Sequence, residues 1–277
     1  MNDPARLPPT EEAEVLDLRR PRRKGIYALP NAITLSALFA SFYAIVMAMS
    51  GRYETAVIAI FAAAVLDSLD GRVARMTNTQ SAFGEQMDSL ADMVSFGAAP
   101  ALIVYEWALK DMGKLGWIPA FVYLAGAALR LARFNVNIGV VDKRFFQGLP
   151  SPAAAALVMG MIWVVDDAGL KGVSKIDWVT WLAFAVTLYA GLTMVTNAPF
   201  YSFKVFGGKR TVPFIVVVAI ALGIAVVSLD PPRVLFALFC LYGVSGYVVY
   251  GYRKLKGKPV SVIATSTDEP DEIGLHR

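Results

Sequence analysis

Long apolar segments separated by short polar ones run through the chain from residue 28 to residue 252. Each segment is close to the ~20 residues that an α-helix needs to cross a hydrocarbon layer ~30 Å thick. The expected helices cover residues 28–50, 53–75, 86–109, 116–138, 150–165, 177–196, 213–229 and 233–252. The pattern therefore predicts an all-α integral membrane protein with about eight transmembrane helices.

The composition agrees with this class and divides the chain into three parts. Of the 277 residues, 56% are hydrophobic and 17% are charged. Residues 1–27 are predicted to be a basic cytoplasmic segment beside the membrane, residues 28–252 the transmembrane catalytic domain, and residues 253–277 a polar, disordered cytoplasmic tail. The single histidine, His276, lies in that tail and the single cysteine, Cys240, in the last predicted helix. Neither a histidine-dependent site nor a disulfide framework within the chain is therefore expected.

Lysine and arginine are distributed unevenly between the two sides of the predicted bundle. If residue 1 lies in the cytoplasm, that side holds all but six of the 26 Lys and Arg residues. The six on the other side are Arg52, Lys110, Lys114, Lys171, Lys175 and Arg233. The positive-inside rule then places both termini in the cytoplasm and the protein in the inner membrane. This bias accounts for the net charge of +4, so no nucleic-acid partner is expected, and the basic cluster at residues 19–24 is suited to anionic membrane lipids.

Four aspartates interrupt the apolar segments near their predicted cytoplasmic ends. Asp67 and Asp70 lie three residues apart on the second expected helix, and Asp88 and Asp92 lie four apart on the third. Both spacings place the two side chains on one helix face, so the four can converge from neighbouring helices. Converging carboxylates repel each other unless divalent cations lie between them, and oxygen ligands favour Mg²⁺, Mn²⁺ or Ca²⁺ over zinc. The sequence therefore predicts a metal site at the cytoplasmic side of the membrane.

These aspartates belong to a longer motif with fixed spacing. The chain reads Asp67-Ser-Leu-Asp70-Gly71-Arg72-Val-Ala74-Arg75, then eight residues, then Gly84-Glu-Gln-Met-Asp88-Ser-Leu-Ala-Asp92. At all eight specified positions this resembles the pattern D-x2-D-G-x2-A-R-x8-G-x3-D-x3-D of the CDP-alcohol phosphotransferase family. The resemblance implies a metal-dependent membrane transferase that acts on a CDP-linked donor.

The resemblance also implies roles for individual residues. Asp67, Asp70 and Asp88 would hold two Mg²⁺ or Mn²⁺ ions, a site that Ca²⁺ can also occupy, to stabilise charge on the diphosphate. Asp92 would act as the general base toward the acceptor hydroxyl and can also touch a metal ion. The residues expected to bind CDP are Asn31, Thr34, Asp70, Gly71, Ala74, Arg75 and Gly84. The small residues among them let the backbone approach the nucleotide, and Arg75 can pair with a phosphate.

Three further stretches concern the acceptor alcohol. Residues 87–100, 130–135 and 146–152 resemble the multi-spanning bacterial and archaeal branch of the family, whose acceptor is L-serine. This resemblance implies transfer of a phosphatidyl group from CDP-diacylglycerol to L-serine, which gives phosphatidylserine and CMP, in a homodimer. The residues expected to bind serine are Ser95, Arg130, Arg133, Asn135, Gly148 and Ser151. The two arginines, at positions i and i+3, can form a fork for the serine carboxylate, although anchoring at the membrane surface or phosphate binding explains them equally well.

Other functions remain open at this point. Within the family the acceptor can be glycerol 3-phosphate, inositol phosphate or choline, and the donor can be an ether lipid. Membrane prenyltransferases also hold Mg²⁺ between aspartates, but their pattern lacks the framework of Gly71, Ala74, Arg75 and Gly84. An ion-coupled transporter would use intramembrane aspartates but leaves the eight-position match unexplained.

Overall fold

Helices make up most of the computed structural model, which describes residues 28–136, 145–170, 176–202 and 214–256. The helical segments are α2 (Ala28–Met49), α3 (Tyr53–Met76), α4 (Ala82–Asp92), α5 (Ala99–Val104), α6 (Trp117–Val136), α7 (Ser151–Asp167), α8 (Trp178–Val195), α9 (Phe214–Leu229) and α10 (Pro231–Leu255). A helix occupies each of the predicted positions, with ends that differ by a few residues. The predicted segment 1–27 and nearly all of the predicted tail lie outside the described residues.

Four helical segments of the described chain are long and apolar enough to cross a membrane. They are Leu29–Met49, Ala82–Leu115, Trp178–Val195 and Pro231–Leu255. Such lengths match the thickness of the hydrocarbon layer, so the chain is a membrane protein. The helix α3 carries the motif charges, and α7 and α9, with 17 and 16 residues, are shorter than an average span.

The third predicted helix is not a uniform α-helix. It begins at Ala82, where the Ser81 hydroxyl caps the helix by accepting a hydrogen bond from the Gly84 N–H at 3.0 Å. After α4 the chain forms a π-helical turn, η1 (Met93–Ala98), then α5, a second π-helical turn, η2 (Tyr105–Leu109), and a 3₁₀ segment, η3 (Lys110–Leu115). In the first π turn the Ala99 N–H donates to the carbonyl of Val94, five residues earlier.

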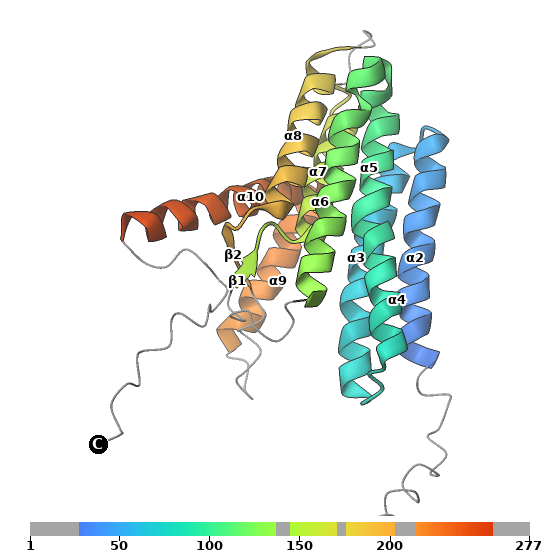
Figure 1. Cartoon of the computed structure of the whole chain (residues 1–277), viewed down its shortest axis with the longest axis vertical. Coiled ribbons are helices and arrows are strands. Elements are labelled where there is room, and N and C mark those ends of the chain that lie inside the picture. The colour runs from blue at the N-terminus through green and yellow to red at the C-terminus, as the bar shows by residue number, and fades with distance from the viewer. Residues whose placement is uncertain (1–27, 137–144, 171–175, 203–213, 257–277) are drawn as a thin grey trace, which may run out of the picture.

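The helices pack so that the two halves of the motif lie side by side. Figure 1 shows α2, α3 and α4 next to one another, with the start of α2, the end of α3 and the start of α4 at one end of the bundle. The alanine-rich helix α7 is buried along almost its whole length and packs against α3, α8 and α10. Helix α10 runs across the bundle axis, and its C-terminal end extends away from the other helices (Figure 1).

A short two-stranded element joins two connections near the motif. The strands β1 (Phe145–Gln147) and β2 (Pro199–Tyr201) pair antiparallel, with Phe146 opposite Phe200. Gly148 follows β1 with a φ of +75°, in the region that favours glycine, and its N–H donates to the carbonyl of Ala198 at 2.9 Å. The all-α prediction did not include this element, because it pairs segments about fifty residues apart.

Helices α6 and α8 approach closely at a pair of glycines. A Cβ atom added to Gly191 would lie 2.7 Å from the Cα and 2.8 Å from the backbone N of Tyr123, and one added to Gly126 would collide with the Gly191 backbone. Backbone atoms cannot move aside as a side chain can. The two glycines therefore allow the small-residue contact that membrane helices use in place of a hydrophobic driving force.

Substitution of Gly191 by Ala is expected to destabilise the protein by about 2 kcal/mol or more, because overpacking forces the two backbones apart. The measurement is the thermal unfolding midpoint of the purified protein in detergent. The matched control is Gly223→Ala in α9, where a Cβ atom meets nothing within 4 Å. The control should be neutral or slightly stabilising. Equal midpoints for the two variants would contradict the close α6–α8 contact.

Candidate active site

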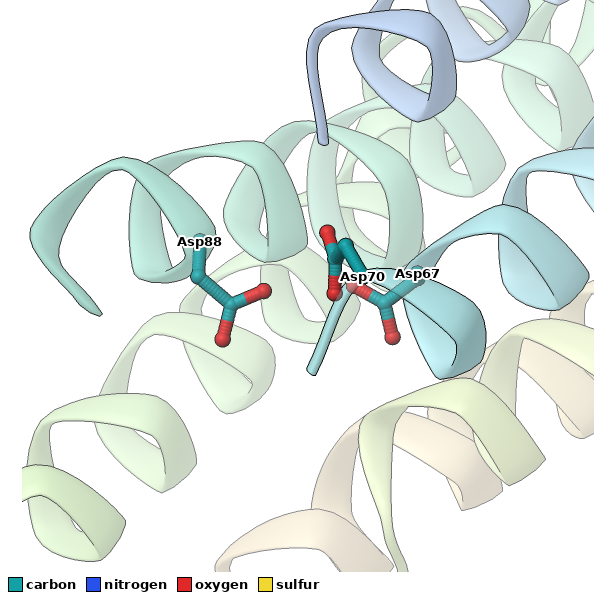
Figure 2. Close-up of side chains that lie close together, drawn as sticks. All are labelled: Asp67, Asp70 and Asp88. Atoms are coloured by element: carbon teal, nitrogen blue, oxygen red, sulfur yellow. The ribbon is translucent and has the colours of Figure 1, made fainter. Parts of the chain in front are cut away.

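Three carboxylates converge from α3 and α4. One oxygen from each of Asp67, Asp70 and Asp88 lies within 4.8 Å of the other two. Figure 2 shows Asp67 and Asp70 on one helix and Asp88 reaching toward them from the next. Asp70 is only 3% exposed, and the other two are half-buried. The expected convergence is therefore present for these three aspartates.

A hard divalent cation fits this set of ligands. Oxygen ligands lie 2.0–2.6 Å from Mg²⁺ or Ca²⁺, so two ligands of one ion are at most about 4–5 Å apart. The observed spread of 4.8 Å meets that limit, and every donor is a carboxylate oxygen. Asp67, Asp70 and Asp88 can therefore hold such an ion.

Helix α2 contributes to the site through Thr34. Its hydroxyl is buried and lies 2.6 Å from Oδ2 of Asp70, to which it donates a hydrogen bond. This contact fixes one oxygen of the carboxylate, and second-layer hydrogen bonds of this kind orient metal ligands. The structure thus gives Thr34 a contact that the sequence did not predict, in addition to its place beside the expected nucleotide.

Asp92 lies beside Asp67, with the two carboxyl groups close enough to share a hydrogen bond. It is not part of the group within 4.8 Å, but it lines the same large cavity as they do. Its Oδ1 atom is buried, and no N–H or hydroxyl group of the described residues donates a hydrogen bond to it. Burial of an unpaired carboxylate oxygen is costly, which points to a ligand or proton donor at that atom.

Two cavities meet at the aspartates. The smaller has a volume of about 200 Å³ and lies between α2, α3 and α4. The larger has a volume of about 950 Å³ and extends toward α6 and the start of α7. Both are lined by Asp70, Gly71, Arg75 and Asp88. A ligand with two chemically different ends can therefore lie in both cavities with its centre at the carboxylates.

The structure brings the residues expected to bind CDP around the smaller cavity. All seven line it: Asn31, Thr34, Asp70, Gly71, Ala74, Arg75 and Gly84. At Gly84 an added Cβ atom would lie 3.2 Å from the Ser81 Oγ and 3.4 Å from the Asn31 Oδ1, so a side chain would narrow the cavity. The sequence missed the further lining residues Thr79, Gln80, Ser81 and Glu85. Residues 77–81 connect the two halves of the motif and so must lie beside both helices. That position in the sequence could have predicted Thr79, Gln80 and Ser81 as lining residues.

Two of the residues expected to bind serine line the larger cavity. The Arg130 Nη1 donates to the Ser151 Oγ at 2.9 Å, and both residues lie in the cavity wall with Asp92. The Nε of Arg130 has no hydrogen-bond partner among the described residues. Phe134 and Phe146 also line the cavity, together with Arg72 and Arg75, so it combines three arginines, four carboxylates and an apolar wall.

The other four residues expected to bind the substrate serine lie outside the two cavities. The two arginines do not form a fork, because Arg133 donates to the Val195 carbonyl at 3.0 Å and to the Asn197 Oδ1 at 3.4 Å, at the end of α8. Asn135 donates to the Ser89 Oγ at 3.2 Å. Ser95 is buried in the π-helical turn η1, and Gly148 forms the turn after β1. None of these four lines either cavity as the structure describes them.

Carboxylates that can hold a divalent cation, in apolar helices beside two cavities with shared lining residues, fit a membrane enzyme that acts on a charged ligand. The sequence model of the CDP-alcohol phosphatidyltransferase family matches residues 27–189, and the chain belongs to this family. The matched region contains the whole motif, both cavities and the helices α2 to α7.

Several curated proteins similar to this chain carry the name CDP-diacylglycerol–serine O-phosphatidyltransferase. One from Helicobacter pylori is 36% identical over 224 residues, which cover 80% of this chain and 92% of that protein. One from Methanocaldococcus jannaschii is 32% identical and covers 69% of this chain and 82% of that protein. One from Saccharomyces cerevisiae is 40% identical over 151 residues, half of this chain and 54% of its own length.

Proposed function

We propose that this chain transfers the phosphatidyl group of CDP-diacylglycerol to the hydroxyl of L-serine, which gives phosphatidylserine and CMP. The observation that carries the proposal is the meeting of two cavities at the aspartates of the motif. The smaller cavity suits a nucleotide, and the larger suits a lipid chain and a small amino acid. The names and coverage of the relatives support serine as the acceptor.

The donor is proposed to lie with its cytidine in the smaller cavity and its diphosphate at the aspartates. Arg75 lines both cavities and can pair with a phosphate oxygen. Asp67, Asp70 and Asp88 would hold Mg²⁺ or Mn²⁺, proposed to be two ions in the active state and replaceable by Ca²⁺. The bound metal would neutralise the charge that develops on the diphosphate as the leaving group departs.

Asp92 is proposed to take the proton of the serine hydroxyl. The hydroxyl oxygen forms a bond to the phosphorus of the phosphatidyl group, the bond from that phosphorus to the CMP oxygen breaks, and the proton passes to Asp92. The buried, unpaired Oδ1 supports this role, because a base must reach the hydroxyl in a site that excludes water. Arg130 lies within electrostatic reach of Asp92, so serine bound at Arg130 has its hydroxyl near the base.

Serine recognition is proposed to centre on Arg130, since of the two arginines predicted to bind serine it is the one that lines the cavity, while Ser151 accepts a hydrogen bond from its guanidinium. Arg133 is proposed to hold the end of α8 through its hydrogen bonds there. Ser95, Asn135 and Gly148 lie behind or beside the cavity and are not proposed to touch serine. Unlike glycerol phosphate or inositol phosphate, serine carries a carboxylate and an ammonium group without a phosphate. Arg130 can pair with the carboxylate of serine, and the aspartates that line the same cavity suit its ammonium group.

Substitution of Arg130 by Ala is expected to raise the serine KM roughly ten- to a hundredfold, because a charge-assisted contact worth about 1.5–3 kcal/mol is lost. The KM for CDP-diacylglycerol should change far less. The matched variant is Arg133→Ala, which removes the same charge one helical turn away and should raise the serine KM much less. If Arg133→Ala has the larger effect on the serine KM, the assignment of the two arginines is reversed.

The membrane arrangement is proposed to consist of eight spans with both termini in the cytoplasm and the active site at the inner leaflet of the inner membrane. The distribution of Lys and Arg supports this orientation, since the motif arginines Arg72 and Arg75 lie at the same end of the bundle as the site. A homodimer is proposed from the family resemblance.

The direct test of the function uses purified protein in detergent with CDP-diacylglycerol and Mg²⁺ or Mn²⁺. Release of CMP is measured with L-serine, glycerol 3-phosphate, inositol phosphate and choline in parallel. We expect release with serine alone. Release with another alcohol and not with serine would show that the acceptor is that alcohol. No release with any of them would overturn the assignment as a transferase.

A further inference from the structure

A cluster of buried hydroxyls surrounds the π-helical turn η1, directly after Asp92. The Tyr123 hydroxyl, on α6, donates to the Phe96 carbonyl at 2.9 Å. The hydroxyls of Ser41, on α2, and Ser95, in the turn, are hydrogen bonded at 2.7 Å. Tyr123, Ser41 and Phe96 are 0% exposed and Ser95 is 1% exposed, so all four are removed from solvent and from both cavities.

The π-helical turn determines which face of α4 looks toward α3. On its C-terminal side, α5 is fixed in the core by Ala99, Ile103 and Val104, each 0% exposed. One residue of an α-helix turns it by about 100°, so the extra residue in a π turn rotates α4 by about that angle relative to a continuous helix. Without the turn, the face that carries Asp88 and Asp92 would point away from Asp67 and Asp70.

A π-helical turn is rare because the α-helix is the more favourable form, so contacts from other helices must hold it. The hydroxyls of Tyr123 and Ser41 supply such contacts from α6 and α2. The turn is also closely packed at Gly97, where an added Cβ atom would lie 3.2 Å from the Ala127 Cβ. Tyr123 from α6 and Ser41 from α2, through Ser95, therefore hold the π-helical turn from two sides.

We propose that Tyr123 and the Ser41–Ser95 pair are positioning residues, which hold the π-helical turn after Asp92 and so set the orientation of the general base. This inference rests on the proposed function, because it assigns the purpose of the turn through Asp92. It also gives Ser95 an indirect role, through the helix, in place of contact with serine.

The chain offers a matched pair of substitutions for the test. Tyr123→Phe removes a hydroxyl that bonds to the carbonyl of η1, and Tyr189→Phe removes one that bonds to the Gly243 carbonyl in α10, also at 2.9 Å. Both variants lose a single tyrosine-to-backbone hydrogen bond between helices, and both are assayed well below their unfolding midpoints.

We expect Tyr123→Phe to lower kcat roughly ten- to a hundredfold, because displacement of a catalytic group by about 1 Å can cost that much. The KM values for both substrates and the kcat of Tyr189→Phe should stay close to wild type. Equal kcat values for the two variants would overturn the inference.

A second pair of substitutions separates the two roles of Ser95. If the serine pair holds the turn, Ser41→Ala and Ser95→Ala lower kcat to a similar extent, and the double variant loses little more than either single one. If Ser95 instead contacts the acceptor, Ser95→Ala raises the serine KM and Ser41→Ala has no effect. That second result would overturn the positioning role of the pair.

A failure of the proposed function can be distinguished from a failure of this inference. If wild-type protein transfers nothing to serine, the function fails, and the inference is then decided by Mn²⁺ binding measured by electron paramagnetic resonance without substrate. Asp88 lies one turn before Asp92 on α4, so rotation of the helix would displace it as well. Tyr123→Phe should then weaken Mn²⁺ binding about tenfold, as loss of second-layer support does, and Tyr189→Phe should not. Unchanged Mn²⁺ affinity in Tyr123→Phe would refute the positioning role of the hydroxyl.

Discussion

Substitution of Asp88 by Asn is expected to reduce turnover about a thousandfold or more. Asp88 is the ligand that α4 contributes to the three carboxylates, and the neutral amide is a much weaker ligand for a hard cation. Loss of metal-based charge stabilisation costs several kcal/mol in the transition state, and each ~1.4 kcal/mol is tenfold in rate. The measurements are CMP release at saturating serine and Mn²⁺ affinity by electron paramagnetic resonance.

The matched control for Asp88 is Asp111→Asn, which removes an exposed carboxylate from η3, outside both cavities. It should retain wild-type turnover and Mn²⁺ affinity.

Excess EDTA should abolish the activity of the wild type, and addition of Mg²⁺ or Mn²⁺ should restore it. Full activity in EDTA, or wild-type Mn²⁺ affinity in Asp88→Asn, would rule out the carboxylate metal site.

Substitution of Asp92 by Asn is expected to lower kcat by about 10²–10⁴-fold while the affinity for CDP-diacylglycerol survives, because a general base acts on the acceptor in the transition state. Asn is close to Asp in shape, so the packing around the buried Oδ1 should be preserved. The measurements are kcat at saturating serine and the binding of a CDP-lipid in the absence of serine.

A comparison of Asp92→Asn with Asp88→Asn separates the base from the ligands. Both substitutions remove one negative charge from α4, but only Asp88→Asn should greatly weaken Mn²⁺ binding. If Asp92→Asn turns over normally at saturating serine, Asp92 is not the base. If it loses Mn²⁺ to the same extent as Asp88→Asn, its main role is as a metal ligand.

The sequence by itself determined the class of protein and the chemical type of the site. Apolar segments of membrane length predicted helices at the positions where the structure has them, because helix length follows from the thickness of the hydrocarbon layer. The spacing of Asp67 and Asp70 fixed them on one face of α3, because a helix repeats every 3.6 residues. The chemistry of oxygen ligands then indicated a hard divalent cation.

Tertiary structure alone decided how these local features meet. The spacing of Arg130 and Arg133 left a fork open as one of several possibilities, but packing directs Arg133 to the end of α8 and leaves Arg130 in the cavity wall. The pairing of β1 with β2 depends on residues about fifty positions apart, which no local pattern reports. The rotation of α4 depends on the π-helical turn, which is held by hydroxyls from α2 and α6. Local spacing determines which residues share a helix face, whereas contacts between distant helices determine what that face meets.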